Sequence, residues 1–113
     1  MGLQHLLAIM EVSHAVQHRL LNPPSGNDAP VNVQTPTVYG TKSTGKLLVC
    51  LMGTWNGTEP ITFTYQWLKD GNPIVGATTY EYTVQAGDVA SSLSCRVTAT
   101  NSEASVNATS PVI

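Results

Sequence analysis

Two runs of alternating apolar and polar residues define the centre of this chain, at residues 63–71, where the alternation reaches back to Ile61, and at residues 92–101. Successive side chains of a β-strand point to opposite faces, so each run predicts a strand with one face in a core and one in water. The inward positions are Ile61, Phe63, Tyr65 and Trp67 in the first run and Leu93, Cys95, Val97 and Ala99 in the second.

A third run, residues 48–52, places Cys50 upstream of Trp67 and Cys95. The order Cys, Trp, Cys is typical of the B, C and F strands of an immunoglobulin-like sandwich. The chain has two cysteines, so a single bridge can form between them. The alternative, which we leave open, is that both are small buried hydrophobes in a protein assembled in a reducing cytosol.

Further motifs surround these strands, and with them the chain resembles the bacterial and bacteriophage Ig-like domain family over residues 36–113. The motifs are GTWNG at 53–57, YQWLKDG at 65–71, IVGAT at 74–78, Tyr82, Asp88 with Val89, and CRVTATN at 95–101. The resemblance implies an all-β, immunoglobulin-like sandwich, and a setting on phage virions or bacterial surfaces. It does not fix a function, because this fold hosts many roles.

Residues 1–21 predict an amphipathic helix, which ends before Pro23 and Pro24 because proline disfavours helix at and before its position. Its apolar stripe supplies the candidate docking residues Leu3, Leu6, Leu7, Met10, Val16 and Leu20. Residues 22–34 form a Pro- and Gly-containing connector, and residues 35–113 form the sandwich domain.

A sandwich closes its own core and leaves the stripe of this helix to be covered elsewhere. The cover can be the outside of its own sandwich, another copy, a membrane or another protein. A membrane is disfavoured because the polar face of the helix carries one Arg and no Lys.

The third run, residues 48–52 with Leu47 before it, is apolar on both faces. With Leu48, Cys50 and Met52 inward, Leu47, Val49 and Leu51 face outward and form either a contact site or a surface covered by the connector or helix. Trp55 is expected to cap one end of the core; a ligand-facing role is the alternative.

The corner before residues 92–101 lacks one familiar feature. Many Ig-like domains have a tyrosine two residues before the second cysteine, where this chain has Leu93. We therefore expect Asp88 to hold this corner alone, through contacts with nearby backbone.

Composition excludes several functions. Charged residues make up 11% of the chain and the net charge is -2, which argues against nucleic-acid binding.

The N-terminus lacks the positive region of a secretory signal, so we expect it to be retained. No spacing predicts a catalytic group or cofactor. His14 and His18 with Glu11 could be drawn as a metal site, but an ordinary helix face accounts for them better, and we predict no metal.

The absence of a catalytic motif favours a non-enzymatic protein, and the resemblance to the phage Ig-like family implies a virion setting. We therefore expect a protein, assembled in the host cytoplasm, that decorates the capsid and displays its sandwich outward. The expected partners are the major capsid protein or another virion protein, together with copies of this chain in an oligomer or symmetric array. Weak binding to cell-surface carbohydrate is compatible with this role. The alternatives are a tail or neck accessory protein and a secreted bacterial surface adhesin.

Overall fold

The computed structural model describes residues 27–113, and this part of the chain is all-β with antiparallel sheets. Apart from a 3₁₀ turn, η1 (Ala86–Asp88), its elements are strands. These are β1 (Val31–Gln34), β2 (Thr37–Tyr39), β3 (Leu47–Leu51), β4 (Thr54–Asn56), β5 (Thr62–Lys69), β6 (Asn72–Pro73), β7 (Glu81–Thr83), β8 (Leu93–Thr100) and β9 (Ser105–Thr109). The predicted N-terminal helix lies outside the described residues.

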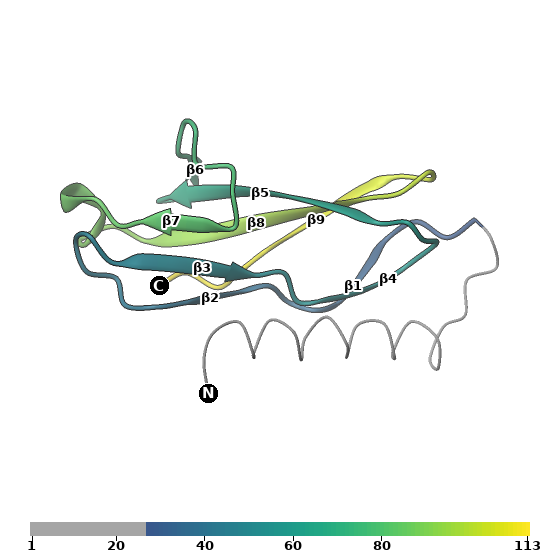
Figure 1. Ribbon diagram of the computed structural model, residues 1–113, viewed down its shortest axis with the longest axis horizontal. Helices are drawn as coiled ribbons and strands as arrows, with labels where there is room; N and C mark the ends of the chain where they lie inside the picture. The colour runs from purple at the N-terminus through teal and green to yellow at the C-terminus, as the bar shows by residue number, and fades with distance from the viewer. Residues whose placement is uncertain (1–26) are drawn as a thin grey trace.

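The strands form sheets in the orders β2-β3-β7 and β6-β5-β8-β9, with a separate β1-β4 ladder. The first two sheets lie one above the other, and β1 and β4 continue the lower layer (Figure 1). This arrangement is consistent with a β sandwich. β1 comes from the last residues of the expected connector, so that part of the connector is a paired strand.

The lower layer is interrupted where β3 passes into β4. Gly53 lies at this point with a φ of +78°, and a Cβ there would lie 2.0 Å from the Gln34 carbonyl oxygen. Only glycine allows so close an approach of two backbones. The chain therefore changes course at Gly53 without leaving the layer.

The two central runs of alternating residues are confirmed as strands β5 and β8. β5 and β8 pair along their whole lengths, from Thr62 opposite Thr100 to Lys69 opposite Leu93. Within this ladder Trp67 lies directly opposite Cys95. As the alternation predicts, Trp67, Leu93, Cys95, Val97 and Ala99 are buried in the core and Phe63 and Tyr65 pack against it, although Leu68 and Ser94 of the other parity are buried too.

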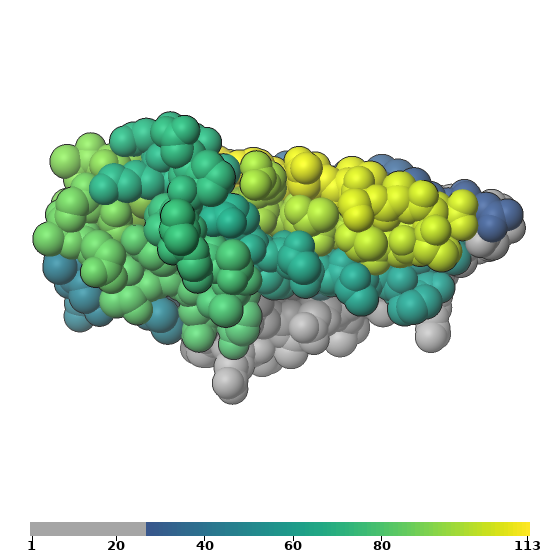
Figure 2. All heavy atoms as spheres, turned by 90° about the horizontal axis from the view of Figure 1, so that it is seen from above, coloured from purple at the N-terminus to yellow at the C-terminus, as the bar shows by residue number. Residues whose placement is uncertain are grey.

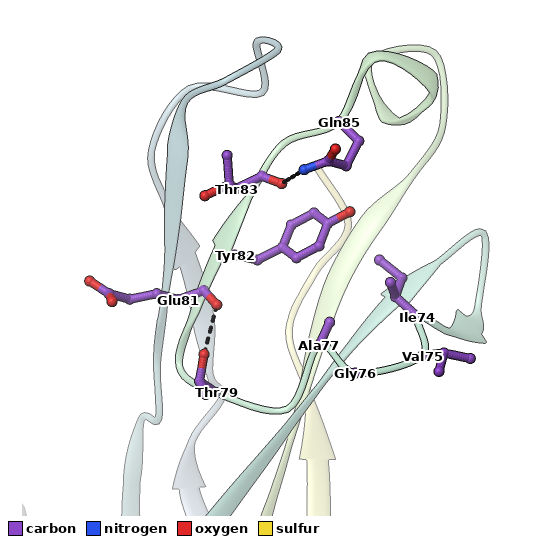
Figure 3. Close-up of a pocket in the computed structure, with 9 residues that line it drawn as sticks. All are labelled: Ile74, Val75, Gly76, Ala77, Thr79, Glu81, Tyr82, Thr83 and Gln85. Carbon is purple, nitrogen blue, oxygen red and sulfur yellow. Dashed lines mark hydrogen bonds between the residues drawn. The ribbon is translucent and has the colours of Figure 1, made fainter.

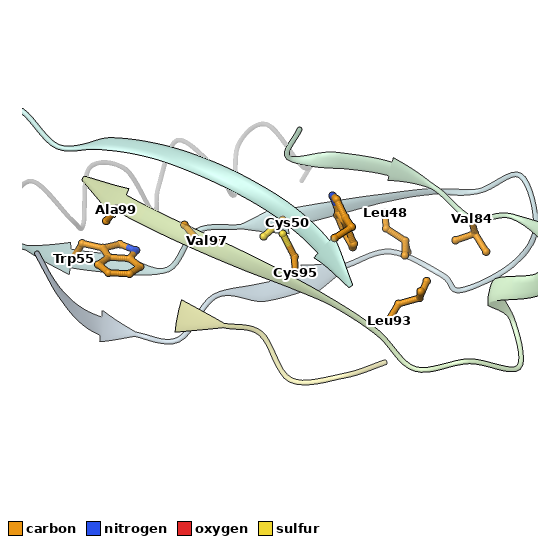
Figure 4. Packing of buried hydrophobic residues seen from close by; sticks show 9 residues of the cluster. Leu48, Cys50, Trp55, Val84, Leu93, Cys95, Val97 and Ala99 are labelled. Atoms are coloured by element: carbon orange, nitrogen blue, oxygen red, sulfur yellow. The ribbon is translucent and has the colours of Figure 1, made fainter. Parts of the chain in front are cut away.

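The core lies between the two layers and contains both cysteines and both tryptophans (Figure 4). Its buried members are Leu48, Cys50, Trp55, Trp67, Val84, Leu93, Cys95, Val97 and Ala99. Cys50 and Cys95 are free thiols whose side chains lie next to each other. The hydrogen bond with the Cys95 thiol, together with burial, raises the pKa of Cys50, so the Cys50 thiol is neutral. Both cysteines are buried in the core and pack as small hydrophobes.

Adjacent leucines on β3 provide a test of this packing. Leu48 is fully buried in the core, whereas its neighbour Leu47 is 49% exposed. Leu48→Ala should lower the free energy of unfolding by about 2–5 kcal/mol, because it leaves a cavity. Leu47→Ala, the matched control, should cost about 1 kcal/mol or less. Urea unfolding followed by tryptophan fluorescence measures both, and equal losses would contradict the assignment.

Candidate interaction surfaces

A buried carboxylate organises the corner between β7 and β8. The Asp88 carboxylate accepts a hydrogen bond of 2.6 Å from the Tyr82 hydroxyl and one of 2.8 Å from the Gln85 backbone N–H. Lys69 Nζ lies 3.4 Å from its other oxygen. Three donors from β5, β7 and the corner itself therefore converge on one acidic side chain.

These contacts change the pKa of both partners. Burial raises the pKa of Tyr82 to about 12, and the hydrogen bond to Asp88 acts in the same direction. Burial by itself would raise the pKa of Asp88, but the hydrogen bonds from Tyr82, Gln85 and Lys69 outweigh it and lower that pKa. The Asp88 carboxylate is therefore ionised at neutral pH and accepts from three donors, which suits a structural clamp.

The expectation that Asp88 acts alone at this corner is wrong. Tyr82 supplies the hydroxyl that Leu93 lacks, from the strand before the corner instead of the strand after it. The signal in the sequence was a tyrosine six residues before the aspartate, and it could be interpreted only with the corner's geometry in hand.

Beside this corner an open groove of about 270 Å³ lies between β7 and the loop that follows β6 (Figure 3). Its lining residues are Ile74, Val75, Gly76, Ala77, Thr79, Glu81, Tyr82, Thr83 and Gln85. Several polar groups here bond to each other: Thr79 Oγ1 donates to the Glu81 carbonyl and Gln85 Nε2 to the Thr83 carbonyl. The groove offers a shallow polar surface with one carboxylate, and residues 27–113 contain no cluster of His, Cys, Asp and Glu that could hold a metal ion.

Trp55 is not available to a ligand. It is fully buried in the core cluster, its indole N–H donates to the Met52 carbonyl at 2.8 Å, and its ring packs edge-on against Phe63. The ligand-facing role considered for Trp55 is therefore corrected to a packing role. The expectation that it caps one end of the core agrees with its position on β4.

The outward residues of β3 divide into two kinds. Leu47 is half exposed, but Val49 and Leu51 are only 1% and 5% exposed, although neither belongs to the core cluster between the sheets. Thr54 and Asn56 continue this face along β4, since Trp55 between them points into the core. We call Val49, Leu51, Thr54 and Asn56 the outer row; all four residues are buried.

The polar end of the outer row has unmet hydrogen-bonding capacity. The Thr54 hydroxyl oxygen and the Asn56 side-chain carbonyl oxygen are buried and have no hydrogen-bond partner in the described part of the chain. Buried polar atoms usually have a partner, and leaving one without costs about 1–3 kcal/mol. The outer row is thus an apolar surface that ends in two acceptor atoms.

The remaining predicted site residues belong to the N-terminal segment. Leu3, Leu6, Leu7, Met10, Val16 and Leu20, and the histidines His14 and His18, lie outside the described residues. Within residues 27–113 the structure has no helix that is long and apolar enough to cross a membrane.

Comparison with known proteins found no family model, no curated protein and no solved structure that matches this chain.

The Asp88 clamp predicts how stability depends on pH. Because folding lowers the pKa of Asp88, its contribution is complete above the unfolded value of about 3.9 and is lost as pH falls through the folded value. Asp88→Asn should therefore cost about 1–3 kcal/mol at pH 7, and less at pH 3. Urea unfolding at both pH values measures this difference.

Glu81→Gln provides the control for that experiment, since it removes an exposed carboxylate from β7. It should change the free energy of unfolding by less than about 0.5 kcal/mol. A loss for Asp88→Asn that is the same at pH 7 and pH 3 would show that the carboxylate charge does not stabilise the corner.

Proposed function

We propose that this chain is a non-enzymatic structural protein of a bacteriophage virion, in which an immunoglobulin-like domain is displayed outward and the N-terminal segment attaches it. The sheet orders support the domain assignment: β2-β3-β7 corresponds to strands A, B and E, and β6-β5-β8-β9 to C′, C, F and G. Cys50, Trp67 and Cys95 meet in one core, as such a domain requires.

The observation that carries the proposal is the outer face of β3. Val49 and Leu51 are buried but contribute nothing to the core between the sheets, so the domain has an apolar surface on its outside in addition to its own core. An outer face that only met water would have polar residues there. An apolar outer face together with an amphipathic segment is what an attached structural module needs.

Attachment in this proposal is driven by apolar burial. Burying one Leu or Val side chain contributes about 1.5–3 kcal/mol, so a stripe of several leucines supplies enough free energy to hold a small domain on a larger particle. Copies in a symmetric array would add avidity where neighbours touch. The partner is the major capsid protein or another virion protein, with a tail or neck position as the variant of the same role.

The adhesin alternative would hold its ligand with Trp55, Tyr39 or the loops near Asp70, and the burial of Trp55 removes one of these three supports. The groove beside Tyr82 does not replace it, because the Thr79 hydroxyl and the Gln85 amide already donate to backbone carbonyls of the groove itself. We therefore favour the virion role over a surface-binding module.

Particle incorporation tests this role directly. Deletion of residues 1–21 should abolish co-purification with assembled particles, and Leu7→Asp should reduce it at least tenfold because a charge then lies in the apolar stripe. Ala8→Asp, which places the same charge on the opposite face of the predicted helix, is the matched control and should leave incorporation unchanged. Full incorporation of the deleted protein would refute attachment by this segment.

A further inference from the structure

The burial of the outer row is not explained by the strands beside it. Thr37 on β2 lies opposite Leu51, and Tyr39 on β2 and Glu81 on β7 lie on either side of Val49. All three flanking residues are exposed. They therefore form the rim of the surface, and the cover over Val49 and Leu51 must come from above the sheet.

No strand of residues 27–113 supplies that cover. The four-stranded sheet packs on the opposite face of β3, where Leu48 and Cys50 join Trp67 and Cys95 in the core. A central-strand valine with exposed neighbours and nothing above it would be open to solvent. We propose that residues 3–21 of the same chain dock on the outer row, with their apolar stripe against Val49 and Leu51.

The dimensions of the two surfaces agree. The outer face from Leu47 to Asn56 covers ten residues, which reach at most about 33 Å because the chain changes course at Gly53 between β3 and β4. A helix over residues 3–21 is about 28 Å long. One predicted helix therefore spans the whole outer row with little left over at either end.

The start of the described chain lies at the correct end of the row. The Asp28 carbonyl accepts hydrogen bonds from the Thr58 backbone N–H at 2.9 Å and from Asn101 Nδ2 at 2.7 Å, which fixes it just beyond the end of β4. Residues 22–26 can span about 17 Å when extended. That length is enough to turn the chain back over the sheet, since layers pack about 10 Å apart.

In this orientation of the segment, a hydrogen-bond donor lies near the polar end of the outer row. Residue 21 would lie near Asn56 and residue 3 near Leu47. Gln17, which interrupts the apolar stripe, is about 6 Å from residue 21 along the helix, and Thr54 is about 7 Å from Asn56 along the strand. The amide of Gln17 is a hydrogen-bond donor, and the two acceptors without partners are Thr54 Oγ1 and Asn56 Oδ1.

The inference concerns the free protein and does not require a virion. Combined with the proposed function, it makes attachment an exchange, because a receptor that binds the stripe must displace it from the outer row. The segment would then be stored on its own domain until a particle surface competes for it.

Hydrogen exchange of the free full-length protein tests the docking. Amides of residues 6–19 should exchange at least tenfold more slowly than in an unstructured chain. Leu51→Asp, which puts a charge into the row, should abolish this protection, and Thr37→Asp on the exposed rim should preserve it. Retained shielding of the Cys50 and Cys95 thiols from a thiol reagent shows that each variant is still folded.

A second pair of variants avoids the sandwich altogether, in case Leu51→Asp unfolds it. Val16→Asp in the stripe should abolish the protection, whereas Ala15→Asp beside it should not. Exchange of the wild-type segment at unstructured rates would overturn the proposal, as would protection that rises with protein concentration, since the occupant would then be a second copy. Loss of particle incorporation with normal protection, or the reverse, separates this inference from the proposed function.

Discussion

Trp67 is the side chain on which the two layers of this domain depend. Its backbone pairs with Cys95 in the β5–β8 ladder, and its indole N–H donates to the Thr79 carbonyl at 2.9 Å. Its ring stacks on the Tyr82 ring, with the two ring centroids 5.5 Å apart. Its backbone N–H donates to the Ala77 carbonyl. One buried residue thus connects β5, β8, the loop after β6 and β7. Through Tyr82 it also reaches the Asp88 clamp, so the core and the corner form one continuous network.

The outer row is buried but does not belong to this core. The inner face of β3 satisfies the packing of the sandwich, and the outer face is apolar as well. A strand that is apolar on both faces is normally covered on both, as in sheets with a layer on each side. β3 has such a sequence in a two-layer domain, which implies a third layer. In our account the N-terminal segment is that layer. Attachment then requires a receptor that displaces the segment from the outer row.

Sequence reasoning succeeded where the signal was local. Alternation alone placed Trp67 and Cys95 inward, because every second side chain of a strand points to the same face. It could not show that β1 pairs with β4, since that ladder joins segments far apart in the chain. It left Trp55 open between packing and ligand contact, because an aromatic residue in a loop sequence suits either. The sequence shows that β3 is apolar on its outer face, but the burial of Val49 and Leu51 could be seen only in the structure.

The central claim is that the outer row and the N-terminal stripe cover each other within one chain. The most direct measurement is a nuclear Overhauser spectrum of the dilute, methyl-labelled full-length protein. Our account predicts cross-peaks between the methyl groups of Val49 or Leu51 and those of leucines in residues 3–21. Methyl signals of those leucines at unstructured chemical shifts, with no cross-peaks to β3, would contradict it.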